Sequence, residues 1–197
     1  LIYLGAGFGG TAVMAVFFVI GILVTSWKLK EKQNAGLAES EKGRRAAGQV
    51  FANAGMAAIA GLIAAYYSDS KYDAFLIIAA CFASATADTV SSELGNIYGS
   101  RFYNILSFKR SPKGLNGVVS VEGTLLGLAG SLIISIVYLL FAHSIAGAVV
   151  ILVAGTAGNI TDSILGATLE NRGYLNNNAV NFLNTVFASI IAWLLAA

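Results

Sequence analysis

Long apolar stretches, separated by shorter polar segments, recur along this chain of 197 residues. Six of them reach the length of about 20 mostly apolar residues that a helix needs to cross about 30 Å of hydrocarbon. The period-2 alternation of apolar and polar residues that is typical of a membrane β-barrel is absent. The pattern therefore predicts an all-α, polytopic membrane helical bundle in a single integral membrane domain, with spans at residues 1–27, 50–67, 74–95, 118–142, 145–169 and 179–197.

The chain starts at Leu1 without a methionine, and no charged segment precedes its first apolar stretch. A secretory signal normally has such a charged segment. We therefore interpret the sequence as part of a longer protein and expect further membrane spans upstream.

Composition agrees with a membrane protein, since 57% of the residues are apolar, 11% are charged and the mean hydropathy is +0.75. A soluble domain carries about 25% charged residues, so an ordinary soluble enzyme is excluded. The sole histidine, His143, lies in a tight connection, which leaves no histidine-ligated zinc site and no Ser–His–Asp triad. The lone Cys81 can form no intrachain disulfide, and neither a P-loop nor a nucleic-acid-binding motif is present.

Basic residues are concentrated in the three long polar connections, residues 28–49, 96–117 and 170–178. Every lysine and arginine except Lys71 lies in one of them. Because loops rich in lysine and arginine stay on the cytoplasmic side, we expect these three connections to face the cytoplasm or its organellar equivalent.

Four acidic residues lie within or at the ends of the predicted spans: Asp88, Glu93, Glu122 and Asp162. An ionisable residue inside a span costs about 2.5 kcal/mol or more, so such residues indicate function by default. Glu122, near the start of a span, is explained equally well as a residue in the wet interface. Asp88 and Asp162 share helix faces with glycine, serine and asparagine, and carboxylates at a cytoplasmic helix end can hold Mg²⁺.

Lys109, Arg110 and Lys113 shortly precede a predicted helix whose first residues are rich in glycine and hydroxyl groups. Helix N-termini and glycine-rich turns present backbone N–H groups to phosphate. For any single lysine, a role in topology or in lipid-headgroup contact stays equally open. Basic loops and acidic helix ends at one membrane face together predict a Mg²⁺–polyphosphate site.

Four segments, ADTVSSELG (87–95), KGLNGVVSVEGTLLGLAGS (113–131), AGNITDSILGATLE (157–170) and LNNNAVNFLNT (175–185), resemble the signature blocks of the phytyl-phosphate kinase family. The upstream segment 25–53 matches in character. Val90 and Ser91 stand where that family usually has Trp and Ala, and Leu115 and Val118 also depart from its pattern. A more distant resemblance links the blocks to CTP-dependent dolichol kinases, phytol kinases and CDP-diacylglycerol synthases.

The resemblance implies CTP as phosphoryl donor, Mg²⁺ as cofactor, and phytyl or geranylgeranyl monophosphate as the acceptor that becomes a diphosphate. Asp88, Asp162 and, directly or through water, Glu93 would hold the metal, and Lys113 would join them as a catalytic residue. Nucleotide and acceptor phosphates would be bound by Lys109, Arg110, Lys113, Ser120, Thr124, Asn116, Arg44, Arg45 and Asn53, with Asn159, Asn177, Asn178 and Asn181 completing the polar floor.

Other interpretations stay open. The acceptor could be a lipid alcohol, which would require Asp88 or Glu93 as a base, or the enzyme could be a lipid cytidylyltransferase that releases pyrophosphate. Outside enzymes, the acidic residues could bind the cation of a transporter, or the protein could be a scaffold. We expect membrane lipids but no nucleic acid as partners, a homodimer as an option, and a prokaryotic inner membrane or an organellar membrane as the location.

Overall fold

The computed structural model describes residues 1–37, 47–67 and 71–196. Six helices in these ranges are long and apolar enough to cross a membrane, which confirms the predicted polytopic all-α bundle. They are α1 (Ile2–Ser26), α3 (Ala47–Tyr66), α4 (Lys71–Tyr98), α5 (Val121–Ala142), α6 (Ile145–Leu165) and α7 (Asn177–Ala196).

Four short elements were not predicted: α2 (Leu29–Asn34), β1 (Phe102–Asn104), β2 (Val118–Ser120) and a π-helical turn (Gly166–Glu170) that continues α6. The two strands pair antiparallel and form, with their connection, a hairpin over residues 102–120. Helix α5 therefore begins three residues later than the predicted span 118–142, because the β-branched pair Val118–Val119 is part of a strand. Ser120 then caps α5, since its Oγ accepts a 3.0 Å hydrogen bond from the Gly123 N–H.

Helix α4 lies at the centre of the bundle. In its most apolar 18-residue window 78% of the residues are buried, against 28–39% in the other five spans. Its buried positions are mostly small, which lets the neighbouring helices approach its backbone. A Cβ at Gly95 would lie 2.9 Å from the Cα of Gly123 on α5, and one at Gly158 of α6 would lie 2.1 Å from the Oγ of Ser84.

Gly158→Ala should therefore destabilise the protein, although alanine is the better helix former. The added methyl group would displace the Ser84 hydroxyl from Asn184, and overpacking of this kind costs about 1–3 kcal/mol. We expect a lower thermal unfolding temperature in detergent. Ala146→Val adds bulk on an exposed face of the same helix and should leave that temperature unchanged; equal temperatures for the two variants would contradict the close packing.

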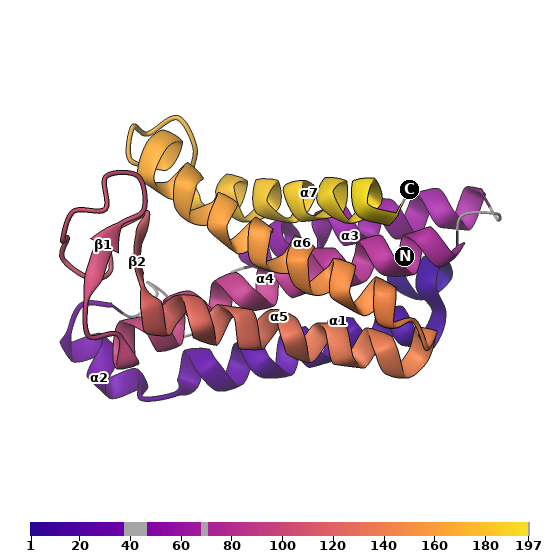
Figure 1. Cartoon of the computed structure of the whole chain (residues 1–197), viewed down its shortest axis with the longest axis horizontal. Coiled ribbons are helices and arrows are strands. Elements are labelled where there is room, and N and C mark those ends of the chain that lie inside the picture. The colour runs from indigo at the N-terminus through magenta and orange to yellow at the C-terminus, as the bar shows by residue number, and fades with distance from the viewer. Residues whose placement is uncertain (38–46, 68–70, 197) are drawn as a thin grey trace.

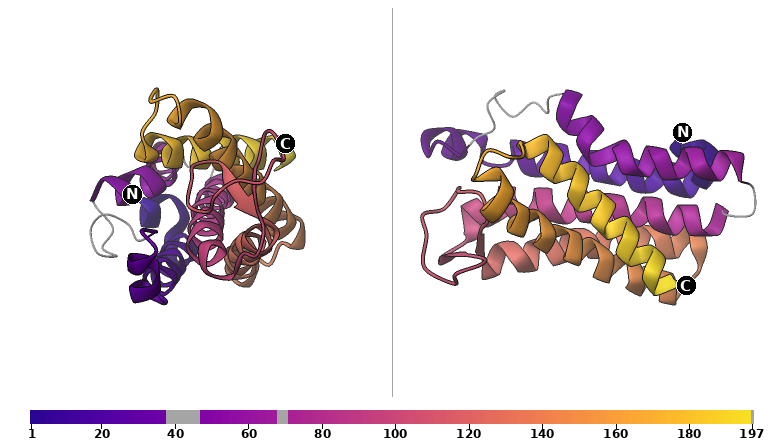
Figure 2. Two further views of the ribbon diagram at one scale, coloured as in Figure 1. Left: turned by 90° about the vertical axis from the view of Figure 1, so that its left-hand side faces the viewer. Right: turned by 90° about the horizontal axis from the view of Figure 1, so that it is seen from above.

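The two ends of the bundle differ. Helix α2, the hairpin and the turn that follows α6 lie at one end, which we call the hairpin end (Figures 1 and 2). The α5–α6 turn at His143 lies at the opposite end, where Lys71 also begins α4. The long basic connections and the short ones are thus separated along the bundle axis, as the sequence predicts.

Candidate functional site

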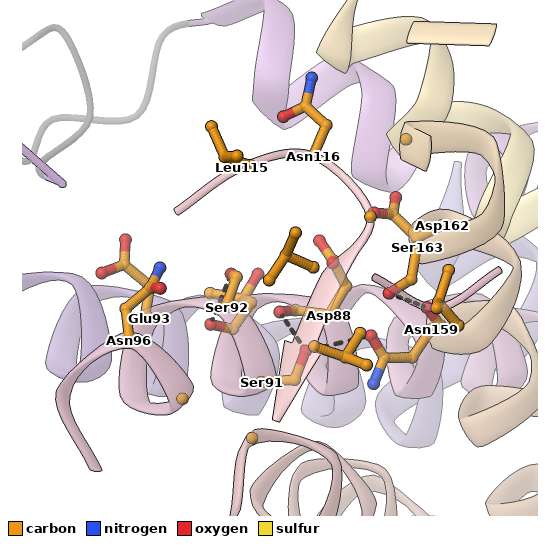
Figure 3. A pocket seen from close by; sticks show the side chains of 18 of the residues that line it. Asp88, Ser91, Ser92, Glu93, Asn96, Leu115, Asn116, Asn159, Asp162 and Ser163 are labelled. Carbon is orange, nitrogen blue, oxygen red and sulfur yellow. Dashed lines mark hydrogen bonds between the residues drawn. The ribbon is translucent and has the colours of Figure 1, made fainter. Parts of the chain in front are cut away.

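A polar cavity of about 420 Å³ lies near the hairpin end of the bundle (Figure 3). Its volume falls within the range of roughly 300–1,000 Å³ that is typical of small-molecule sites. Helices α3, α4, α5, α6 and α7 and the hairpin all contribute to its wall. The polar side chains that line it are Gln49, Asn53, Asp88, Thr89, Ser91, Ser92, Glu93, Asn96, Asn116, Ser120, Thr124, Asn159, Asp162, Ser163, Glu170, Asn177 and Asn181.

The carboxyl groups of Asp88 on α4 and Asp162 on α6 lie within hydrogen-bonding reach of each other in this cavity. Asn184 of α7 donates a 2.8 Å hydrogen bond to Asp162 Oδ1, and the buried Ser84 hydroxyl donates in turn to the Asn184 side chain at 3.1 Å. Two carboxylates in contact repel each other unless a proton or a cation lies between them. The pair is therefore a place where the protein can hold a cation.

Amide and hydroxyl groups surround this pair. Ser91 donates to the side-chain oxygen of Asn159 at 3.1 Å, which fixes the orientation of that amide (Figure 3). Asn53 is 4% exposed, and its Oδ1 has no hydrogen-bond partner among the described residues. A buried acceptor without a partner is rare in native proteins. The Asn53 oxygen, on the wall of the cavity, is thus available to a donor or a cation.

Glu93 has a different environment. Its Oε2 accepts a hydrogen bond from Nζ of Lys32, a lysine that is only 2% exposed and also donates to the backbone oxygens of Val24 and Thr25. Within the described ranges, no three His, Cys, Asp or Glu side chains are placed to hold one metal ion. The structure thus does not assemble the predicted ligand set of Asp88, Glu93 and Asp162, because Glu93 is engaged by Lys32.

The predicted basic clamp is also not part of the cavity wall. Lys109, Arg110 and Lys113 are exposed on the β1–β2 connection, and none of them lines the cavity. The same connection instead contributes residues 114–117. Gly117 has φ +72° and lies so close to the π-helical turn after α6 that a Cβ would sit 2.3 Å from the Cβ of Ala167. Arg44 and Arg45 lie outside the described residues.

Most of the remaining predicted residues do line the cavity: Asn53, Asn116, Ser120, Thr124, Asn159, Asn177 and Asn181. Asn178 does not; it is exposed and faces Gly48 of α3. The hydroxyls of Ser120 and Thr124 already stabilise the start of α5, because Thr124 donates to the Ser120 backbone oxygen at 2.9 Å. Glu122 accepts hydrogen bonds from the Ser100 backbone and hydroxyl outside the cavity, which agrees with an interface role.

Sequence reasoning missed two charged residues near the cavity, Lys32 and Glu170. Glu170 lines it, close enough to Asp162 for their charges to interact. Glu170 follows Asp162 by eight residues and Gly166 by four, a spacing that could have placed it on the same face. Lys32 offered no such signal, since its partner Glu93 is 61 residues away in the chain.

Fold and site together define an integral membrane protein with an acidic, amide-rich cavity at one end of its helical bundle. The chain belongs to the family described as integral membrane protein DUF92, whose sequence profile matches residues 1–189. The family resemblance predicted from the sequence blocks is confirmed by this match and by the relatives.

The curated relatives come from distant organisms. Protein VTE6, chloroplastic, of Arabidopsis thaliana is 32% identical over 96% of this chain, and the chain spans only 59% of its length. An uncharacterized membrane protein of Synechocystis is 33% identical over 98% of the chain and 76% of its own length. Another uncharacterized membrane protein, from Methanocaldococcus jannaschii, is 31% identical over 96% of the chain and 77% of its own length. No solved structure matches the chain.

Proposed function

We propose that this protein is a CTP-dependent kinase that converts an isoprenyl monophosphate, phytyl or geranylgeranyl, to the diphosphate. The observation that carries the proposal is the contact of Asp88 with Asp162 in a cavity lined by amides and hydroxyls. The resemblance of the sequence blocks supports the choice of donor and acceptor. The excess of lysine and arginine at the hairpin end supports an active site on the cytoplasmic or stromal side.

The residues present are compatible with Mg²⁺. Two carboxylates in contact need a positive charge or a proton between them, and the buried Asn53 oxygen adds a neutral acceptor to the same cavity. These are the oxygen donors that Mg²⁺ prefers, together with water and phosphate. Asp88 and Asp162 would hold the ion. When bound, it would neutralise negative charge on the phosphates of the donor.

The transfer itself requires positioning more than proton chemistry. An oxygen of the acceptor monophosphate, already anionic near neutral pH, attacks the γ-phosphorus of CTP; the bond to the β-phosphate oxygen breaks and CDP leaves. Asn159 and Asn181 would orient phosphate oxygens, with N–H groups of the loop 114–117 above them. Exposed on the same loop region, Lys109, Arg110 and Lys113 would attract the polyanion to the cavity.

The proposal is tested with the full-length protein in nanodiscs, γ-labelled CTP, Mg²⁺ and phytyl monophosphate. We expect label in phytyl diphosphate and release of CDP. Release of pyrophosphate would instead indicate a lipid cytidylyltransferase. If the protein does not bind CTP, the nucleotide proposal is wrong and the cation-coupled transporter becomes the leading hypothesis.

A lipid-alcohol kinase is the second candidate function, and the contact between the two carboxyl groups is the observation that favours it. An alcohol must lose a proton during attack, and a carboxylate of the Asp88–Asp162 pair could accept it. Glu93, the other predicted base, is neutralised by Lys32. Phytol in place of phytyl monophosphate distinguishes the two kinases, because only the alcohol kinase would label it.

A further inference from the structure

Helices α5 and α6 separate towards the hairpin end, although a two-residue turn joins them at the opposite end (Figure 1). Near that turn they pack closely: a Cβ at Gly147 would lie 2.7 Å from Tyr138, and the Ser131 hydroxyl donates to the Leu152 oxygen at 3.3 Å. Farther along, Gly127 approaches Asn159, where a Cβ would lie 2.7 Å from Nδ2.

Between Gly127 and the hairpin end, the two helices pack against different elements. Helix α5 stays on α4, with Gly123 against Gly95, whereas the extension of α6 packs on the hairpin, with Ala167 against Gly117. Figure 1 shows the resulting divergence of α5 and α6 in front of α4. The cavity described above lies at this level, with walls from both helices.

Two residues of the cavity wall, one from each of these helices, are exposed. Thr124 of α5 and Ile160 of α6 both line the cavity and are exposed, Ile160 to 43%. Leu128, one turn from Thr124, is 38% exposed. Both helices are candidate membrane spans. Leu128 does not line the cavity, whereas Asn159 and Asp162 line it together with Thr124 and Ile160. At this border, the polar side chains of the cavity thus lie close to the exposed apolar residues Leu128 and Ile160.

Contacts between described residues are present at two other borders of the cavity. Helices α3 and α7 meet where a Cβ at Gly55 would lie 3.1 Å from Phe182. On the α2 side, Lys32 is bonded to Glu93 of α4. The separation of α5 and α6 therefore offers a hydrocarbon chain, attached to a phosphate in the cavity, a path to the bilayer.

We infer that the hydrocarbon chain of the lipid phosphate leaves the cavity through this α5–α6 opening and lies against Thr124, Leu128 and Ile160. Its phosphate faces the Asp88–Asp162 pair. The inference rests on the proposed function for the identity of the acceptor, and it assigns the residues that contact the chain. Apolar contact and shape, rather than hydrogen bonds, select the lipid there.

Bulky substitutions test the opening. Leu128→Trp should lower kcat/KM for phytyl monophosphate about tenfold or more by obstructing the chain, without changing the KM for CTP or the turnover of the five-carbon dimethylallyl monophosphate, because Leu128 does not line the cavity. The matched control is Leu132→Trp, one turn farther from the cavity, at a residue of similar exposure that does not line it either. Equal effects of the two variants, or equal loss with both acceptors, would overturn the inference.

Photolabelling tests the same path without turnover. Phytyl monophosphate with a diazirine at the chain terminus is irradiated with the protein in nanodiscs. We expect label on peptides that contain Leu128 or Ile160, reduced by unlabelled phytyl monophosphate. Label spread without competition over lipid-facing residues such as Phe51 and Ile190 would overturn the inference. Competed label at the opening without any phosphoryl transfer would leave the opening assigned and contradict only the kinase.

Discussion

Replacing Asp88 by asparagine should lower the rate of phosphoryl transfer by roughly 10²–10³-fold, the loss that follows removal of one group that stabilises transition-state charge. Asparagine has nearly the same shape, and its amide can still hydrogen-bond to Asp162, so the cavity should keep its form. What disappears is one of the two negative charges that would hold Mg²⁺. The initial rate with γ-labelled CTP measures the effect.

A rise in the Mg²⁺ concentration required for half-maximal activity should accompany the loss. Glu122→Gln is the matched control, since Glu122 is also an acid at a helix end but is bound to Ser100 outside the cavity. Its activity and the thermal unfolding temperature of both variants should equal those of the wild type. An Asp88→Asn variant with wild-type rate and metal dependence would refute the assignment of the carboxylate pair.

The spans were predictable because hydropathy acts over some twenty residues, and local exceptions average out. Because of the same averaging, hydropathy did not predict the hairpin. Each of its strands has three residues, too few for a period to be seen, and Val118 and Val119 are as apolar as the helix that follows. Their strand conformation depends on pairing with Phe102–Asn104, a tertiary contact that hydropathy does not predict.

Within the site, helical spacing placed Asp88 and Ser91 correctly and indicates a different direction for Glu93. Asp88 and Ser91 share a face of α4, and both line the cavity with Asn159 and Asp162 of α6. Five residues further on, Glu93 is rotated by about 140° from Asp88 at 3.6 residues per turn. Glu93 still lines the cavity, but its carboxylate pairs with Lys32.

The predicted phosphate clamp shows that the positions of basic residues in the sequence do not predict which of them are buried. Lys109, Arg110 and Lys113 lie in the connection that covers the cavity, as their position in the chain implied, yet they are exposed. Among the lysines whose burial the structure describes, the buried one is Lys32, which the sequence showed only as one of several cations in a basic loop. Burial of a long cationic side chain depends on its acceptors, and these come from α1 and α4.

Lys32→Met should therefore destabilise the protein strongly, by about 3–5 kcal/mol, because it leaves the Glu93 carboxylate without its buried partner. The backbone oxygens of Val24 and Thr25 at the end of α1 lose their donor as well. Equilibrium unfolding in detergent measures the change. For comparison, Lys28→Met removes an exposed lysine that pairs with Glu31, and such pairs are worth about 0.5 kcal/mol or less.

The double variant Lys32→Met/Glu93→Gln separates the two contributions. Removing the carboxylate charge relieves the larger penalty, so the double variant should be more stable than Lys32→Met alone. What remains is the loss of the lysine at the end of α1, about 0.3–1 kcal/mol for a cation at a helix C-terminus. Equal stability of the single and double variants would show that the Glu93 charge is solvated without Lys32, and the pair would then be a surface contact rather than a buried one.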